Sequence, residues 1–243
     1  MIGAAEKSYI IRMFHVHHYF GTQKALIDIT LDIAKNEFVF INGPSGAGKT
    51  TLLKLLYLGE PVSEGQVLID GVNLARIPRN KIPYLRRKFG IIFQDYKLIP
   101  TKNVFDNVAL VLEAAGIKGR IIQKKVKRIL RLVGMEDKHK SLPPSLSGGE
   151  QQRVAVARAI VGDPKIILAD EPTGSLDEES AETILNLLRG THIRGATVII
   201  ATHDKALIRK TGGHVLGLKQ GRLETSTFLE KQYDDTILQT GDR

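Results

Sequence analysis

Apolar residues recur along this chain in patterns of two kinds, one typical of strands and one typical of helices. Apolar and polar residues largely alternate over residues 25–33, which predicts a strand with one buried face. The run Ile166-Ile167-Leu168-Ala169 is apolar throughout, as expected of a parallel strand covered on both faces. Strands are predicted at residues 9–16, 25–33, 37–42, 66–71, 90–94, 166–170 and 197–201, with a hairpin over 214–223.

The pattern becomes helical at about residue 95. Val104, Val108 and Leu112 would share one helix face, and apolar residues between 126 and 133 would share another. Further helices are predicted at residues 51–58, from 147 to about 161, and at 178–189 and 204–210. We therefore expect an α/β domain over residues 10–225, with tails at 1–9 and 226–243. Its N-terminal strands would form an antiparallel β subdomain, and an α-helical subdomain, about residues 95–160, would be inserted into the core.

Composition narrows the classes of protein that remain. The 243 residues contain no cysteine, which excludes disulfides and thiolate chemistry. No apolar run approaches the roughly 20 residues that span a bilayer, and no signal-peptide core is expected. The net charge of +9 favours an anionic neighbour, whether nucleotide, nucleic acid or the inner face of a membrane, although a solvated basic surface would give the same value. The basic run at residues 124–131 is interpreted as a solvated helix face, with a binding surface as the alternative.

A glycine-rich loop between the strand at 37–42 and the helix that follows carries the first candidate chemistry. Its sequence fits G-x-x-x-x-G-K-[ST], the phosphate-binding loop of P-loop nucleoside triphosphatases. Successive backbone N–H groups and the start of the helix would surround a phosphate there, while Lys49 neutralises the outer phosphates and Thr50 ligates Mg²⁺. The predicted nucleotide-binding residues are Gly43, Pro44, Ser45, Gly46, Ala47, Gly48, Lys49, Thr50 and Thr51.

Two acidic residues follow the buried strand at 166–169. Beside a phosphate loop, Asp170 would hold Mg²⁺ through water, and Glu171 would polarise the water that attacks the phosphate. The alternative is a strand that simply ends in acidic turn residues. Because a metal-bound phosphate needs such carboxylates, the catalytic interpretation is favoured.

A second anion site is predicted at the start of the helix after Pro143-Pro144. Ser147, Gly148 and Gly149 would present a hydroxyl and free backbone N–H groups, although Ser147 and Glu150 also fit a capping box. The segment Leu-Ser-Gly-Gly-Glu at 146–150 resembles the signature motif of the ATP-binding cassette (ABC) ATPases. With the phosphate loop and the acidic pair in the same order, that resemblance extends from about residue 10 to 223.

The resemblance implies roles for several further residues. Tyr19 would stack on adenine, with Phe20 as a competing candidate, and Gln94 would touch Mg²⁺ and the attacking water. Asp177 would lie in the loop that joins two active sites, and His203 would contact the γ-phosphate. ATP and Mg²⁺ would be the ligands. Two such domains would dimerise head to tail, so that Ser147, Gly148 and Gly149 of one copy close over ATP held by the other.

Within the family, the phosphate-loop and signature segments look most like those of the bacterial cell-division ATPases. That resemblance implies an integral membrane subunit as partner, peripheral attachment at the cytoplasmic face of the inner membrane, and no direct nucleic-acid contact. The partner is expected near residues 94–104, where Tyr96, Leu98 and Ile99 would be exposed. Lipoprotein-release and macrolide-export ATPases are the alternative, and a soluble nucleic-acid or ribosome-associated ABC protein is an alternative of another class. Ser175 and about nine additional N-terminal residues depart from the cell-division pattern.

Overall fold

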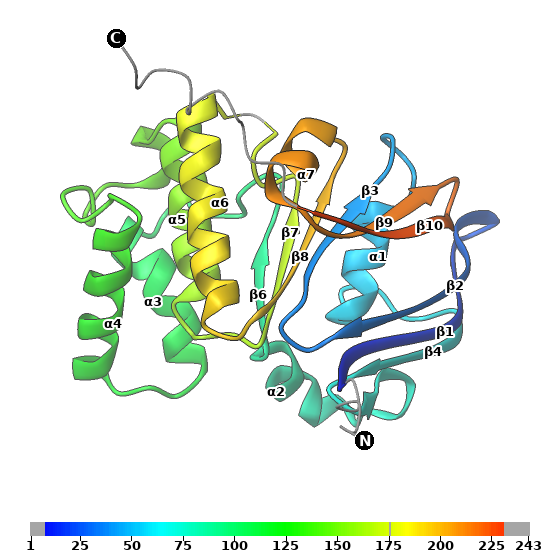
Figure 1. Ribbon diagram of the computed structural model, residues 1–243. Coiled ribbons are helices and arrows are strands. Elements are labelled where there is room, and N and C mark those ends of the chain that lie inside the picture. Colours follow the sequence, from blue (N-terminus) through cyan, green and yellow to red (C-terminus); the bar gives the residue numbers. More distant parts are fainter. Residues whose placement is uncertain (1–7, 175, 231–243) are drawn as a thin grey trace, which may run out of the picture.

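Two β-sheets lie on either side of one helix in the computed structural model, which describes residues 8–174 and 176–230 (Figure 1). The smaller sheet is antiparallel and has the order β2-β1-β4-β5. The larger has the order β10-β9-β3-β8-β7-β6 and is parallel except for β10. The strands are β1 (Tyr9–Phe20), β2 (Gln23–Ala34), β3 (Phe38–Asn42), β4 (Glu64–Ile69), β5 (Val72–Asn73), β6 (Phe89–Ile92), β7 (Ile166–Asp170), β8 (Thr197–Thr202), β9 (Gly213–Lys219) and β10 (Arg222–Leu229).

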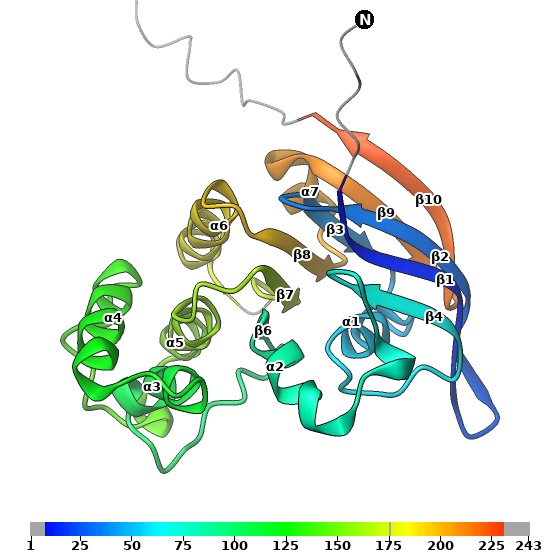
Figure 2. The same ribbon diagram turned by 90° about the horizontal axis from the view of Figure 1, so that it is seen from below.

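Helix α1 (Lys49–Leu56) occupies the space between the sheets, as Figures 1 and 2 show. Its four leucines are buried, and they join one apolar core that includes Met13 from the smaller sheet and Ile41 from the larger. A helix with a sheet on each side needs apolar residues around most of its circumference. The leucine-rich sequence after the phosphate loop meets that requirement.

The opposite face of the larger sheet is covered by a layer of helices. Phe40 and Ile167 point into the core on the helical side, whereas their neighbours Val39 and Ile166 belong to the core around α1. Both faces of these strands are therefore covered, as their continuous apolar sequences predicted. The helices are α3 (Val104–Ala114), α4 (Gly119–Leu132), α5 (Gly148–Ile160), α6 (Glu178–Ile193) and α7 (Lys205–Thr211).

The chain from β6 to β7 forms the helical insertion that the sequence predicted. Helix α3 ends before Gly116, whose φ of 76° lies in the left-handed region that glycine adopts without strain. Helix α4 then buries Ile122, Val126 and Leu130 and forms the outer edge of the molecule (Figure 2). Most basic residues at 124–131 are exposed on the side away from the core, as both predicted alternatives, a solvated face and a binding surface, require.

Three short elements between β5 and β6 had no counterpart in the sequence prediction. They are the 3-10 turns η1 (Leu74–Arg76) and η2 (Arg79–Lys81) and helix α2 (Ile82–Arg86). Pro78 and Pro83 interrupt this stretch and keep each element to about one turn, too short for a periodic pattern to be detected. A further 3-10 turn, η3 (Pro143–Ser145), precedes α5.

The C-terminal strand β10 continues to Leu229, past the boundary at 225 that the sequence predicted. His214 on β9 explains the added length, because its Nε2 lies 2.8 Å from Ser226 Oγ and its ring stacks on Phe228 at 4.3 Å. Residues 1–7 and 231–243, most of the two predicted tails, lie outside the described residues. No helix in the described ranges has the length and apolar character needed to cross a bilayer.

Candidate active site

A cavity of about 720 Å³ lies beside the phosphate loop, where the carboxyl ends of β7 and β8 meet the start of α1. Residues 44–51 line it on one side, with Gln94, Asp170, Glu171, Gly174 and His203. Hairpin turns of both sheets complete the wall with Phe20, Gln23, Lys24, Ala25, Gln220 and Gly221. Segments predicted separately from the sequence thus form one site.

The phosphate loop is held in a shape that its glycines permit. A Cβ on Gly43 would lie 2.1 Å from the Leu218 carbonyl oxygen, and Gly48 has a φ of 104°. The loop is also tied to the β9–β10 turn, because the Gly221 N–H donates to the Ala47 carbonyl at 3.0 Å. The N-terminus of α1 therefore opens onto the cavity with its backbone N–H groups available for an anion.

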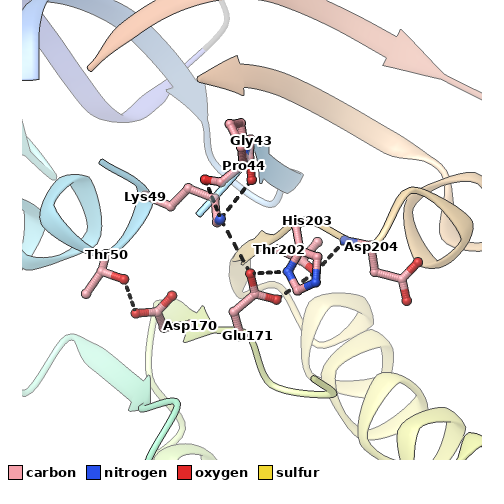
Figure 3. A network of polar contacts seen from close by, with 9 residues as sticks. All are labelled: Gly43, Pro44, Lys49, Thr50, Asp170, Glu171, Thr202, His203 and Asp204. Carbon is pink, nitrogen blue, oxygen red and sulfur yellow. Dashed lines mark hydrogen bonds and ion pairs between the residues drawn. The ribbon is translucent and has the colours of Figure 1, made fainter. Parts of the chain in front are cut away.

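Lys49 is the buried cation of the cavity. Its side chain is only 8% exposed, and Nζ donates to the carbonyl oxygens of Gly43 at 2.8 Å and Pro44 at 3.3 Å. Glu171 Oε1 lies 3.5 Å from the same nitrogen (Figure 3). An anion entering the loop would therefore meet a lysine already positioned by the loop's own backbone.

Asp170 and Thr50 form a pair at the end of β7. Thr50 Oγ1 donates to Asp170 Oδ2 at 2.6 Å, while Asp170 Oδ1 is buried without a hydrogen-bond partner among the described residues. Burial raises the pKa of Asp170 above its ordinary value, and the hydrogen bond from Thr50 opposes that shift. An orphaned carboxylate oxygen beside a hydroxyl is a donor set that suits a hard divalent cation.

Glu171 is oriented by two residues from the end of β8 (Figure 3). Thr202 Oγ1 donates to Glu171 Oε2 at 3.0 Å, and His203 Nδ1 lies 2.8 Å from Oε1. The backbone of Glu171 has a φ of 45°, a strained value for a residue with a side chain. Thr202 was given no role by the sequence analysis, although it directly precedes His203.

Phe20 and Tyr19 are the two aromatic candidates for stacking on adenine, and the structure places Phe20 at the cavity wall. Tyr19 is absent from the cavity wall, and its ring lies near His17, with 6.3 Å between centroids. The pairing of β1 with β2 shifts register between His18 and Tyr19. Such a shift changes which side chains point to each face, so counting along the sequence does not distinguish the two neighbours.

The signature segment lies outside this cavity. Ser147 Oγ accepts from the Glu150 N–H at 3.3 Å and Glu150 Oε2 accepts from the Ser147 N–H at 2.9 Å, which is a complete capping box at the start of α5. Asp177 similarly caps α6, and hydrogen bonds from the Ser180 N–H and hydroxyl hold its pKa below the ordinary value. Ser175 lies outside the described residues. Within one copy, therefore, these residues do not meet Lys49.

The apolar residues of the loop after β6 are less exposed than the sequence predicted. Leu98, Tyr96 and Ile99 are half-buried, and Leu98 packs against the core on the helical side. Arg158 donates to the Tyr96 and Lys97 carbonyl oxygens, at 2.6 Å each. These contacts fix the loop that carries Gln94 to the cavity wall.

Comparisons with known proteins agree with this geometry. The ABC transporter family model matches residues 26–174. The cell division ATP-binding protein FtsE of Streptococcus pneumoniae is 41% identical over 221 residues, covering 90% of this chain and 96% of the relative. FtsE of Escherichia coli is 44% identical over 215 residues, covering 88% of this chain and 97% of the relative. A solved dimer of the ATP-binding cassette MJ0796, bound to ADP and Pi, superposes with a TM-score of 0.84 at 34% identity, covering 91% of this chain and all of that one.

Proposed function

Because this chain belongs to the ABC transporter family and is an ATPase of the FtsE type, we propose that it drives a separate membrane subunit in bacterial cell division. The observation that carries the hydrolytic part of the proposal is the cavity in which Lys49, Asp170 and Glu171 meet the phosphate loop. A phosphate-binding lysine and two separately oriented carboxylates are the groups that hydrolysis of a nucleoside triphosphate requires.

Each of these groups has a distinct task in the proposed mechanism. Lys49, released from the loop carbonyls, would neutralise the β- and γ-phosphates held by the loop's N–H groups. Glu171 would accept a hydrogen bond from the attacking water and orient it toward the γ-phosphorus. Thr202 and His203 would fix the Glu171 carboxylate, and His203 would also contact the γ-phosphate. Gln94, which also lines the cavity, would contact the same water.

Asp170 and Thr50 fit a Mg²⁺ ion, and Gln94 would complete the set of side chains facing it. The unpartnered, buried Oδ1 of Asp170 supports this assignment, because an acceptor without a donor is costly unless a cation or water satisfies it. Mg²⁺ bound there would neutralise charge that develops on the phosphate oxygens.

Closure of two copies over ATP would bring the remaining predicted residues into the site. Ser147, Gly148 and Gly149 of one copy would meet the γ-phosphate held by Lys49 of the other, and Asp177 would lie where the two sites join. The capping box uses the N–H groups of Ser147 and Glu150, which leaves those of Gly148 and Gly149 for an incoming phosphate. MJ0796 is dimeric with ADP and Pi bound, which supports the closure of two copies.

The partner of this ATPase would be an integral membrane subunit of the FtsX type, which would hold the chain at the cytoplasmic face of the inner membrane. The loop after β6 remains the proposed contact, now through its exposed residues Asp95, Lys97 and Pro100 rather than through Leu98. ATP-driven closure would then relay a signal to cell-wall hydrolases outside. The FtsE relatives favour this function over lipoprotein release or macrolide export, and over a ribosomal or nucleic-acid role.

The test is the Glu171→Gln variant, which keeps the size of the side chain and removes its charge. Hydrolysis should fall by a factor on the order of 10² or more, the scale of general-base loss, while ATP still binds. Size-exclusion chromatography with light scattering should show a dimer only when Mg-ATP is present. A variant that hydrolyses ATP at the wild-type rate would refute the role of Glu171.

The control for an ATP site shared between two copies changes Ser147 in the Glu171→Gln background. Ser147→Asp retains a good helix cap but places a carboxylate against the incoming phosphate, so it separates capping from ATP contact. We expect ATP binding to the monomer to persist and the dimer to be lost. A dimer that survives this change would limit Ser147 to capping α5.

A further inference from the structure

A strongly basic surface follows β5, on a part of the chain that the nucleotide site does not use. Residues 74–93 contain six basic and no acidic residues, and none of them lines the nucleotide cavity. We call these six cations the basic arc: Arg76, Arg79, Lys81, Arg86, Arg87 and Lys88. Five of them are exposed and Lys88 is half-buried.

The positive charge of the arc is largely uncompensated. Among the described residues, only Lys88 pairs with a carboxylate, that of Asp70, at 2.7 Å. Arg86 donates to the Tyr57 and Leu58 carbonyl oxygens, which orient its guanidinium without neutralising it. Cations whose charge no carboxylate neutralises are available to an anionic partner.

A shallow apolar groove of about 390 Å³ opens within the arc. Val72, Ile77, Pro78, Tyr84 and Leu85 supply its apolar wall, and the groove shares no lining residue with the nucleotide cavity. Tyr84 is 60% exposed, so an aromatic ring stands at the rim among the cations. An amphipathic ring beside basic side chains is typical of protein surfaces at a membrane interface.

The basic surface continues from the arc toward α4. Arg87 Nη2 donates to the Ala114 carbonyl at 2.6 Å, which holds the end of α2 against the end of α3. Figure 2 shows α2 and α3 on the same side of the molecule, with α4 beyond α3. The chain from 114 to 135 adds seven basic and no acidic residues, of which Lys125 pairs with Asp163 at 2.7 Å and Arg131 pairs with Glu136 at 2.7 Å. The contact of Arg87 with the end of α3 thus joins the arc to this second basic segment.

We propose that this surface binds the anionic headgroups of a phospholipid bilayer directly, in addition to any contact with a membrane subunit. Its breadth fits a lipid surface better than one acidic peptide, because the charges are spread over separate elements. Nucleic acid fits less well, since Lys81 and Arg87 already lie over the Tyr84 ring, at 5.6 and 4.9 Å, where a base would stack. The apolar groove would receive the upper part of an acyl chain.

The experiment is co-sedimentation of the full chain with vesicles of phosphatidylglycerol and phosphatidylcholine, compared with phosphatidylcholine alone. Arg76→Gln, Arg79→Gln and Lys81→Gln are combined in one variant. Each basic residue near an anionic surface strengthens binding about five-fold, so the triple variant should bind roughly a hundred-fold more weakly. Wild-type binding should fall as salt rises.

The matched control removes the same charge elsewhere, at Lys205, Arg209 and Lys219, which also become glutamine. The first two lie on α7, at the opposite end of the molecule from α2 in Figure 1. The control should bind vesicles as the wild type does, and both variants should keep wild-type ATP affinity, which shows that they fold. Equal loss in both variants would overturn the proposal, as would equal affinity of the wild type for duplex DNA and for anionic vesicles.

Discussion

Truncating Phe20 to alanine should weaken nucleotide binding by about five-fold while leaving the turnover rate at saturating ATP unchanged. Phe20 stands at the cavity wall on the β1–β2 turn, and an edge-to-face contact with His18, at 4.6 Å between centroids, holds its ring. A ring that is already positioned loses little freedom when a base stacks on it. Stacking is also similar before and after hydrolysis, so its loss should raise KM and spare kcat.

The magnitude follows from the exposed part of the ring. Phe20 is 46% exposed, and an aromatic side chain has roughly 200 Å² to bury, so roughly 90 Å² remains accessible. At about 25 cal/mol per Å², covering all of it would stabilise the complex by about 2 kcal/mol. A base covers only one ring face, which leaves about 1 kcal/mol, or about five-fold in affinity.

Tyr19 provides the matched comparison, because it is the neighbouring aromatic residue but lies outside the cavity wall. Calorimetric titration of Phe20→Ala, Tyr19→Ala and the wild type with Mg-ATP would measure the three affinities. Tyr19→Ala should bind ATP as the wild type does. The reverse result, in which Tyr19→Ala loses ATP affinity and Phe20→Ala keeps it, would refute the assignment of Phe20 as the residue that stacks on the base.

Three further outcomes are expected. Lys49→Ala should abolish measurable ATP binding in calorimetry, because the loop loses its buried cation; wild-type affinity would contradict the phosphate-loop assignment. Thr202→Val should lower kcat about ten-fold with little effect on ATP affinity, since Glu171 loses the hydroxyl that orients it; an unchanged kcat in steady-state kinetics would contradict this role. Asp70→Asn should cost about 1 kcal/mol in urea unfolding at neutral pH. Hydrogen bonds from two lysines lower the pKa of Asp70 to about 2. The contribution of the ionised Asp70 to the free energy of unfolding is therefore complete above about pH 4 and disappears as pH falls through about 2. If wild type and variant still differed by as much in their free energy of unfolding at about pH 2, the ion pairs of Asp70 could not be the cause of that difference.

The chemistry of the site was largely determined by the sequence, because it rests on local backbone requirements. The phosphate loop needs glycines beside a strand and a helix, and the apolar run before Asp170 makes that residue emerge from a buried strand. Ser147 and Glu150 lie three residues apart, the spacing of the capping box that the structure contains. Each of these features depends on neighbours within a few positions, so a pattern along the chain is enough to predict it.

Only the tertiary structure decided which side chains share the cavity wall. Phe20 lines the wall and Tyr19 does not, at a point where β1 pairs irregularly with β2, and no pattern in the sequence reveals such pairing. Gln220 reaches the cavity because its turn is bonded to the phosphate loop, from which it is separated by most of the chain. Leu98 is half-buried since the helical core covers it. Register and burial are set by contacts between distant segments, and these contacts exist only once the chain has folded.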